Sequence, residues 1–205
     1  MAKVRLTKGE LKRQRDALRQ YGRYLPTLQL KKQQLQLEIL QQITLLSEKR
    51  QVESKKKEAI KDWAGLLVEP GINIKQWLVP SGIITGTKNV AGVDLPVFER
   101  IEFKEPEYDL FNMPLWVDFA IEALRSLVSL KKEIEVVEKG ITILKWELRI
   151  TTQRVNLFEK VMIPQATEAI RLIKIYIGDQ MTNAVGRCKI AKRKIEQAVF
   201  EGVAV

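Results

Sequence analysis

Histidine is absent from this chain of 205 residues, and Cys188 is its only cysteine. The absence of histidine removes the commonest general base and the commonest zinc ligand. A single cysteine cannot form a disulfide within the chain, and this cysteine usage fits a reducing cytoplasmic setting. We therefore expect no transition-metal site, no cofactor and no catalytic residue.

Long hydrophobic runs are also missing. No apolar run approaches the roughly 18 residues that suggest a membrane-spanning helix. The N-terminal sequence MAKVRLTKGELKRQR lacks the apolar segment of a secretory signal. We therefore expect neither direct membrane insertion nor secretion.

Basic residues outnumber acidic ones, and the excess lies at the two ends of the chain. The sequence has 35 basic and 25 acidic residues, a net charge of +10. Residues 1–60 carry 15 basic and 6 acidic side chains, whereas residues 61–115 carry 5 and 8. A basic end can attract nucleic acid, anionic lipid or an acidic protein surface, although charge runs are often solvated helix faces. The basic clusters lack the interleaved aromatic residues that favour single-strand binding.

One apolar stripe dominates the C-terminal half. Its members are spaced alternately three and four residues apart, which predicts a helix with a seam, the side that a partner helix must cover. Beyond Pro164 the stripe changes phase, which predicts a kink or stutter there. The first series is Ala120, Ala123, Leu127, Leu130, Ile134, Val137, Ile141, Leu144, Leu148, Thr151, Val155, Phe158, Met162, Gln165, Ala169, Leu172 and Tyr176; the second is Ile170, Ile173, Ile177, Met181, Ala184, Cys188, Ala191, Ile195 and Val199.

The N-terminal segment predicts a second long helix. Thr7 and Glu10 have the spacing of a capping box, so the helix should begin near Lys8 and run to about residue 68. Pro26 lies inside it and predicts a kink. Two seam series run along it, with several polar members that can fix the register. They are Leu11, Leu18, Leu25, Lys32, Ile39, Leu46, Glu53, Ile60 and Leu67, and Gln14, Tyr21, Leu28, Leu35, Gln42, Lys49, Lys56 and Trp63.

Between the helices lies an insertion, residues 69–114, that contains five of the seven prolines. Helical periodicity stops, and short extended segments separated by turn residues predict a small β-hairpin lobe. We expect the turn at Gly86–Asn89. The expected extended segments are 72–74, 77–79, 82–84, 90–97 and 98–103.

These elements predict a mainly α fold: a long antiparallel two-helix coiled coil with a small β-hairpin lobe inserted in the middle of the chain. The antiparallel arrangement brings the N- and C-termini together at one end, because the compact insertion cannot span the length of a helix. The expected division is an N-terminal helix at 1–68, the lobe at 69–114 and a C-terminal helix at 115–205. The helices form one discontinuous rod domain.

Residues 152–164, TQRVNLFEKVMIP, form a segment that resembles the signature of the D subunit of the archaeal/vacuolar-type rotary ATPases. That family has approximately Arg-Arg-Val-Asn-Ala-Leu-Glu-x-Val-x-Ile-Pro. Gln153 replaces the first arginine, and Leu157-Phe158 replaces Ala-Leu. The length, the two-helix rod and the insertion agree as well. The matching residues are Arg154, Val155, Asn156, Glu159, Val161, Ile163 and Pro164.

The resemblance implies a non-catalytic rotor subunit of the central stalk. Such a shaft transmits rotation between a catalytic head of A and B subunits and a membrane ring, and so couples ATP synthesis or hydrolysis to proton or sodium transport. Its other implied partners are an F subunit and a subunit that caps the ring, in a cytoplasmic complex peripheral to the membrane. Candidate head contacts at the basic ends are Arg5, Lys8, Lys12, Arg13, Lys192, Arg193 and Lys194.

Two alternatives stay open at this point. The first is a free-standing coiled-coil scaffold or adaptor whose lobe binds a partner. The second, which the spacing of the aromatic residues disfavours, is a basic coiled coil that binds nucleic acid. Pro26 and Pro164 are the candidate kinks of the shaft under the rotor hypothesis.

Overall fold

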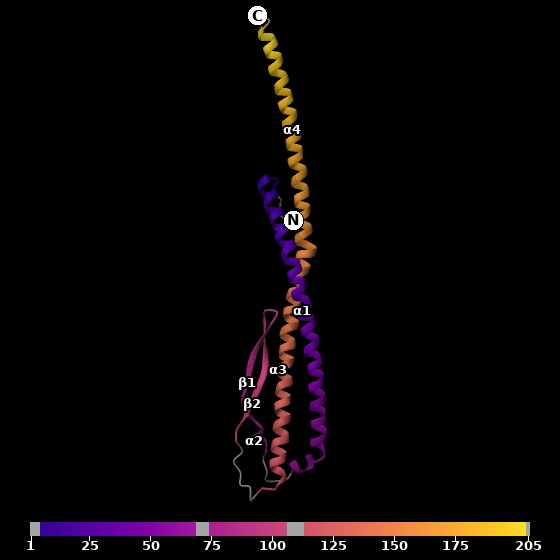
Figure 1. Ribbon diagram of the computed structural model, residues 1–205, viewed down its shortest axis with the longest axis vertical. Coiled ribbons are helices and arrows are strands. Elements are labelled where there is room, and N and C mark those ends of the chain that lie inside the picture. Colours follow the sequence, from indigo (N-terminus) through magenta and orange to yellow (C-terminus); the bar gives the residue numbers. More distant parts are fainter. Residues whose placement is uncertain (1–4, 69–73, 106–112, 204–205) are drawn as a thin grey trace. The chain divides into compact units, whose positions relative to one another are not determined.

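The computed structural model describes residues 5–68, 74–105 and 113–203 (Figure 1). It confirms a mainly α fold with a long N-terminal helix, a long C-terminal helical segment and a β-hairpin between them. The elements are α1 (Lys8–Lys61), the 3-10 helix η1 (Ala64–Val68), α2 (Lys75–Leu78), β1 (Pro80–Val90), β2 (Val93–Phe103), α3 (Trp116–Leu157), the π-helix η2 (Phe158–Met162) and α4 (Ile163–Val203).

The chain forms two compact units. The first unit comprises residues 1–29 with 153–205, and the second comprises residues 30–152. Helix α1 contributes to both units, as does the segment that begins with α3. The division at 68/69 and 114/115 expected from the sequence stays a prediction.

In the second unit, α1 and α3 pair in antiparallel fashion. The Lys31 ammonium lies 3.1 Å from Glu147, and that of Lys49 lies 2.7 Å from Glu133. Farther along α1, Lys56 donates a hydrogen bond to Ser126. The residue number rises on one helix as it falls on the other, which defines the antiparallel direction.

The predicted seam is confirmed, although α1 ends at Lys61 rather than near residue 68 and the last two seam members, Trp63 and Leu67, lie beyond it. Every member of the two series is buried or half-buried, and Leu35 and Ile39 are the fully buried ones. The polar seam members Lys49 and Lys56 bond to α3, as just described. A solvent-accessible ion pair or a single hydrogen bond contributes only about 0–1.5 kcal/mol, so these contacts select the register more than they stabilise the pair.

The hairpin turn lies at Ala91-Gly92, where φ is 51° and 75°. Positive φ at both central residues is typical of a type I′ hairpin turn. The Asn89 side-chain oxygen accepts a hydrogen bond from the Gly92 amide, and its nitrogen donates one to Asp94. The turn expected at Gly86–Asn89 is wrong, because these residues belong to β1 and pair with residues 94–97 of β2. Alanine rarely adopts positive φ, so composition alone pointed to the wrong glycine.

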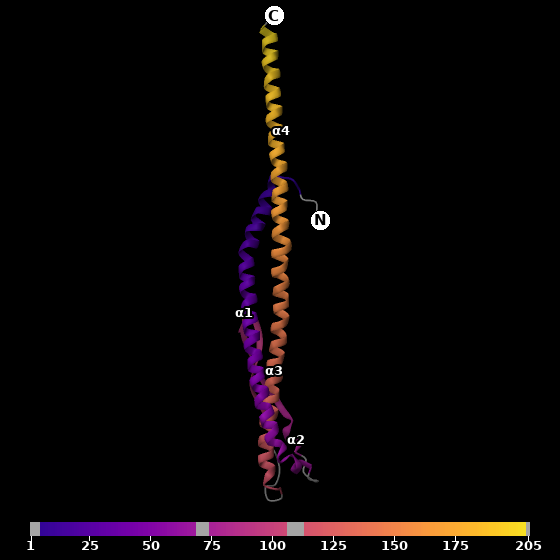
Figure 2. The same cartoon turned by 90° about the vertical axis from the view of Figure 1, so that its right-hand side faces the viewer.

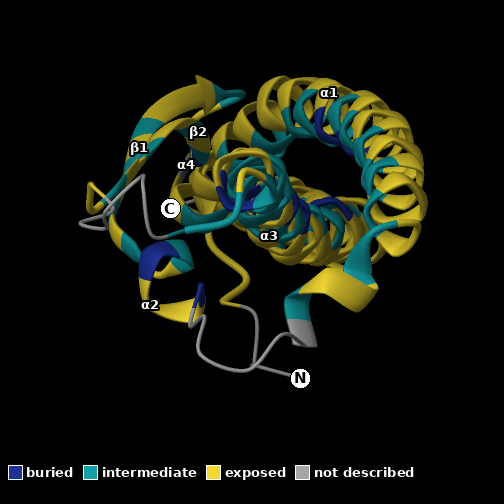
Figure 3. Cartoon of the chain, turned by 90° about the horizontal axis from the view of Figure 1, so that it is seen from below, coloured by how far each residue is buried: buried dark blue, intermediate teal, exposed yellow. Residues whose placement is uncertain are grey.

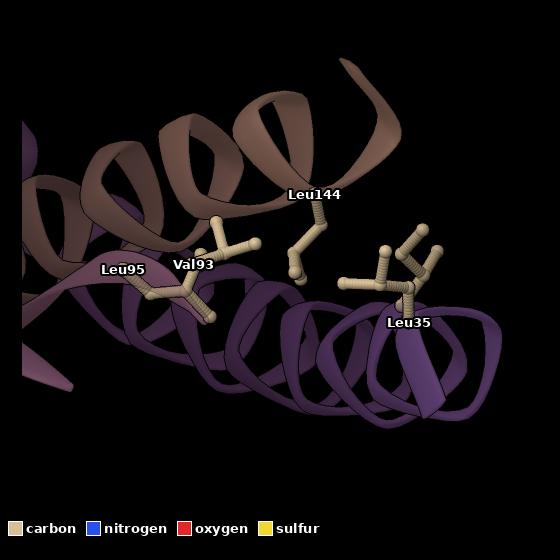
Figure 4. Packing of buried hydrophobic residues seen from close by; sticks show 5 residues of the cluster. Leu35, Val93, Leu95 and Leu144 are labelled. Carbon is tan, nitrogen blue, oxygen red and sulfur yellow. The ribbon is translucent and has the colours of Figure 1, made fainter. Parts of the chain in front are cut away.

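The hairpin packs on both helices of the second unit. Val93 and Leu95 of β2 are buried against Leu35 and Ile39 of α1 and Leu144 of α3. Figure 4 shows these side chains converging from the three elements. Figure 3 colours these elements by burial and shows the buried positions of α1 on the side of the helix nearer α3. The first core of this unit is therefore a three-element contact rather than a simple two-helix seam.

A second core lies around α2 and the beginning of α3. Trp77 of α2 packs with Val117, Ala120 and Ile121, and Ile74 completes the buried set. The extended segment expected at 77–79 is wrong for Trp77 and Leu78, because they belong to the short helix α2. Residues 72 and 73 lie outside the described residues. Apolar pairs in so short a segment carry no decisive period.

In the first unit, the beginning of α1 runs beside α4 in the opposite direction (Figures 1 and 2). The Thr7 hydroxyl accepts a hydrogen bond from the Glu10 amide, as the capping box requires. The Glu10 carboxylate accepts from Gln14 instead of the Thr7 amide, so only half of the box forms. Helix α4 continues well beyond the start of α1, so the expectation that both ends lie together is wrong.

We expect Leu144→Ala to lower the free energy of unfolding by about 2–5 kcal/mol, because it removes a fully buried side chain at the three-element core. Chemical denaturation followed by circular dichroism at 222 nm would measure the change. The matched control is the neighbouring Ile143→Ala, whose side chain is 38% exposed. Equal losses in the two variants would contradict the assigned core.

Candidate functional site

The signature segment contains a π-helix. Helix α3 ends at Leu157, η2 spans Phe158–Met162, and the Ile163 amide donates to the Phe158 carbonyl, five residues back. On the inner side of this turn, the rings of Tyr21 and Phe158 meet edge to face with centroids 5.4 Å apart. Single π turns inside α-helices occur frequently at functional sites.

This π turn explains the change of phase in the apolar stripe. A wider turn contains one more residue than the α-helical turn it replaces, so the positions that face α1 move by one. Beyond η2 the buried residues are Ala166, Ala169, Ile170 and Ile173. The expected seam members Gln165, Leu172 and Tyr176 are exposed, so the first series is wrong at these positions. The second series is correct at Ile170 and Ile173 and half-buried at Ile177.

Pro164 gives a physical reason for the position of the π turn. Proline has no amide hydrogen, and in an α-helix its ring clashes with the carbonyl four residues earlier, here that of Lys160. Widening the preceding turn moves that carbonyl away from the ring. The expected interruption near Pro164 is therefore a stutter within a continuing helix. Pro26, in contrast, lies inside α1 without a break in the helix.

Most of the signature residues point outward. Val155 is buried and Ile163 is half-buried, so these two serve the packing of the first unit. The others, Arg154, Asn156, Glu159, Val161 and Pro164, are exposed. Packing within the described chain therefore accounts for only part of the signature, and the exposed part is available to another molecule.

One turn farther along, Glu168 and Arg171 form a bidentate ion pair with distances of 2.7 and 2.9 Å. The hydrogen bonds from Arg171 lower the pKa of Glu168, and the same contact raises the pKa of Arg171. Both side chains are therefore charged near neutral pH. The surface next to the signature segment therefore carries an exposed ion pair.

The second apolar series loses its cover along α4. Met181, Ala184, Cys188, Ala191, Ile195 and Val199 are all exposed, and we call them the distal stripe. Met181 is 55% exposed and Ile195 is 65% exposed. No described residue of this chain covers the distal stripe. An expectation that the N-terminal helix packs on it is therefore wrong from Met181 onward.

The basic head-contact candidates occupy two places in the first unit. Arg5, Lys8, Lys12 and Arg13 are exposed at the beginning of α1, and Lys192–Lys194 are exposed on α4. Because α4 continues beyond α1, the fold does not bring the two groups together. Lys192 lies 3.7 Å from Glu196, which is a weak exposed pair. The second basic group flanks the distal stripe in sequence.

The second unit has apolar surfaces of its own. Leu37 and Leu40 of α1 are exposed and, with Leu148 of α3, line an open groove. Leu115 and Phe119, at the beginning of α3, are also strongly exposed. Exposed apolar clusters of this kind are typical of protein–protein contact surfaces.

Among residues 5–68, 74–105 and 113–203, none of the helices combines the length and the hydrophobicity that a membrane-spanning segment requires. The same residues contain no group of three or more Cys, Asp or Glu side chains placed to hold a metal ion.

The fold and its exposed faces define a class: a helical protein in which two long helices pair through an apolar seam while further apolar and basic faces stay exposed. Comparison with known proteins narrows this class. Residues 10–193 match the family described as the ATP synthase D subunit.

Relatives named as the D subunit of V-type ATP synthase agree with that match. The protein of Borreliella burgdorferi is 45% identical over 95% of this chain and 96% of its own length. Those of Chlamydia abortus and Chlamydia trachomatis are 36% and 32% identical; each alignment covers 96% of this chain and 95% and 98% of the relative. The chain belongs to the family of ATP synthase D subunits, which are central-stalk subunits. These findings lend no support to the free-standing scaffold or the nucleic-acid binder.

One contact of the second unit escaped the sequence analysis. Arg125 of α3 donates hydrogen bonds to the carbonyls of Trp77 and Lys104, and its guanidinium lies 5.1 Å from the centroid of the Phe103 ring. It therefore ties α2 and the end of β2 to α3. Arg125 is part of no motif and belongs to neither apolar series. Its hydrogen-bond partners are main-chain carbonyls, and a pattern of residue types does not predict contacts with the main chain.

We expect that removing the extra residue of the π turn is tolerated when the proline is also replaced. Deletion of Lys160 combined with Pro164→Ala leaves an ordinary α-helix and keeps Ile170 and Ile173 facing α1. Thermal unfolding followed by circular dichroism should show a melting temperature close to that of Pro164→Ala alone.

The matched control deletes Glu168 in the same Pro164→Ala background. This deletion turns Ile170 and Ile173 away from α1, and each buried isoleucine contributes about 1.5–3 kcal/mol. The melting temperature should fall clearly. Equal losses for the two deletions would refute the one-residue account of the phase change.

Proposed function

We propose that this chain is the rotor shaft of a V-type ATP synthase and transmits rotation between the catalytic head of A and B subunits and the membrane ring. Its membership of the D-subunit family supports this role. The chain itself catalyses no step, and the chemistry of ATP belongs to the head. Rotation of the shaft couples ATP synthesis or hydrolysis to the transport of protons or sodium ions. In this proposal the part of the complex that contains this chain is cytoplasmic and peripheral to the membrane.

The distal stripe is the single observation that carries the proposal. A helix whose apolar face lies in water is unfavourable by about 25 cal/mol for each square ångström of that face. Another protein must therefore cover Met181, Ile195 and their neighbours. We assign this cover to the head. Apolar contacts are non-directional, so they hold a turning helix in place without requiring one angle.

The basic residues and the signature complete the proposed head surface. Lys192, Arg193 and Lys194 flank the distal stripe, and acidic loops of the head would attract them. Arg5, Lys8, Lys12 and Arg13 would serve the same purpose at the beginning of α1. The exposed signature residues Arg154, Asn156 and Glu159 would contact a partner at the level of the π turn.

The surfaces of the second unit fit the remaining partners. The groove lined by Leu37, Leu40 and Leu148 is open and apolar, and we assign it to the F subunit of the stalk. The exposed Leu115 and Phe119 lie where α3 begins, and we assign them to the subunit that caps the membrane ring. Both assignments rest on exposure of apolar side chains, which a partner would bury.

Charging the distal stripe should weaken assembly with the head. We expect Met181→Glu with Ile195→Glu to reduce co-purification of the A and B subunits at least tenfold, because two carboxylates would lose water in an apolar contact. Affinity purification of the tagged chain followed by quantitative mass spectrometry would measure it.

Gln180→Glu with Gln197→Glu is the matched control, since it places the same charges on other exposed positions of α4. This control should assemble as well as the unaltered chain. If the stripe variant also assembles fully, the head does not cover the stripe.

The prolines should matter for coupling rather than for assembly. We propose that Pro26 and Pro164 bend the shaft locally without breaking its helices. A bent shaft would favour different states of the catalytic sites at different angles, since a bound element shifts an equilibrium only by its differential affinity for the states. We expect Pro26→Ala with Pro164→Ala to lower the number of ions transported for each ATP hydrolysed. Simultaneous assays of pumping and hydrolysis in reconstituted vesicles would test this. Normal coupling in the double variant would show that the two prolines are not needed for coupling.

A further inference from the structure

We infer that the hairpin is a brace that prevents α1 and α3 from sliding along each other in the second unit. This inference deepens the proposed function and rests on it only for its role in torque. A seam with a heptad repeat resembles itself after a shift of seven residues, so it resists such a shift poorly. A shaft that transmits torque needs a stronger constraint on its register.

The hairpin is fixed to α3 at two levels. At its base, Arg125 binds the Lys104 carbonyl at 2.6 Å and stacks on Phe103. At its tip, Val93 and Leu95 pack against Leu144. From residue 125 to 144 a helix rises about 28 Å, and from residue 104 to 95 a strand rises about 30 Å. The two lengths agree, so both attachments form without distortion.

The tip also holds α1. Val93 and Leu95 share one buried cluster with Leu35 and Ile39 of α1 and Leu144 of α3, and Figure 4 shows Leu144 between the strand and Leu35. Sliding α1 by one heptad moves Leu35 about 10 Å along the axis. Because the hairpin stays with α3 through Arg125, that movement replaces Leu35 and Ile39 at the tip by Gln42 and Leu46 in one direction, or by Leu28 and Lys32 in the other. Either shift places a polar side chain in an apolar contact, which is unfavourable. The hairpin therefore opposes sliding even though it belongs to neither helix.

The local geometry keeps the tip in one shape. The turn at Ala91-Gly92 has positive φ at both residues, and Asn89 bonds to Gly92 and Asp94 across it. The Lys31–Glu147 pair joins the two helices near the same level. Ile83 and Val97 are each 42% exposed, so truncating them removes much less buried surface than truncating Val93 and Leu95. Substitutions at these two positions are a matched control within the same hairpin.

The test measures the register directly. In a full-length Cys188→Ala chain, spin labels at Gln34→Cys and Lys145→Cys report the distance between α1 and α3. Both positions are exposed and lie within the second unit. We compare Val93→Ser with Leu95→Ser, the tip variant, against Ile83→Ser with Val97→Ser, the control.

The control should keep one narrow distance distribution. The tip variant should show a distribution at least twice as wide or a second distance, and backbone amides near Leu35 should exchange hydrogen at least about tenfold faster through local opening. If the tip variant loses its helical circular dichroism, Leu95→Ala alone replaces it. A tip variant whose distances stay as narrow as those of the control overturns the inference.

A second measurement addresses torque. In the assembled complex, the tip variant should transport fewer ions for each ATP hydrolysed, whereas the control should not. Broad distances with unchanged coupling would contradict the mechanical role. The distance measurement needs no partner, so a failure of the rotor proposal and a failure of the brace give different results.

Discussion

Burial of one apolar seam between antiparallel helices is the constraint on which the other features depend. Each helix can bury only one stripe against a single partner, so every other apolar residue must be exposed or covered by a third element. In the second unit the hairpin is that third element, through Val93 and Leu95. Along the distal stripe no described residue takes this role. The seam therefore determines which apolar residues the chain buries by itself and which stay exposed for another chain to cover.

The π turn shows how a single residue changes a long helix. From Ala120 to Met162 the seam follows one repeat, and beyond the turn Ala166, Ile170 and Ile173 continue it one position later. Pro164 determines where the π turn lies, because the helical turn before a proline must either widen or break. The signature of the family coincides with this adjustment. The exposed Arg154, Asn156 and Glu159 extend from a segment whose geometry the proline and the seam have already fixed.

The sequence was sufficient for the elements that depend on periodicity. The seam of α1 was correct at every member, including the polar Gln42 and Lys49, since spacing alone determines which side a helical residue occupies. It was insufficient where main-chain geometry decides. The positive φ of Ala91, the main-chain bonds of Arg125 and the width of η2 leave no repeating pattern. The length of α4 beyond α1 also escaped, because an apolar stripe shows that a cover is needed but not which chain supplies it.

The antiparallel pairing also determines the order in which the chain can fold during its synthesis. Lys31 and Glu147 are 116 positions apart, so at usual translation rates the first helix waits roughly 6 to 23 seconds for its partner. The hairpin closes through a two-residue turn and needs no such delay. Nascent chains therefore expose the α1 seam well before α3 emerges from the ribosome. Until then the unpaired seam is free to associate with other nascent chains.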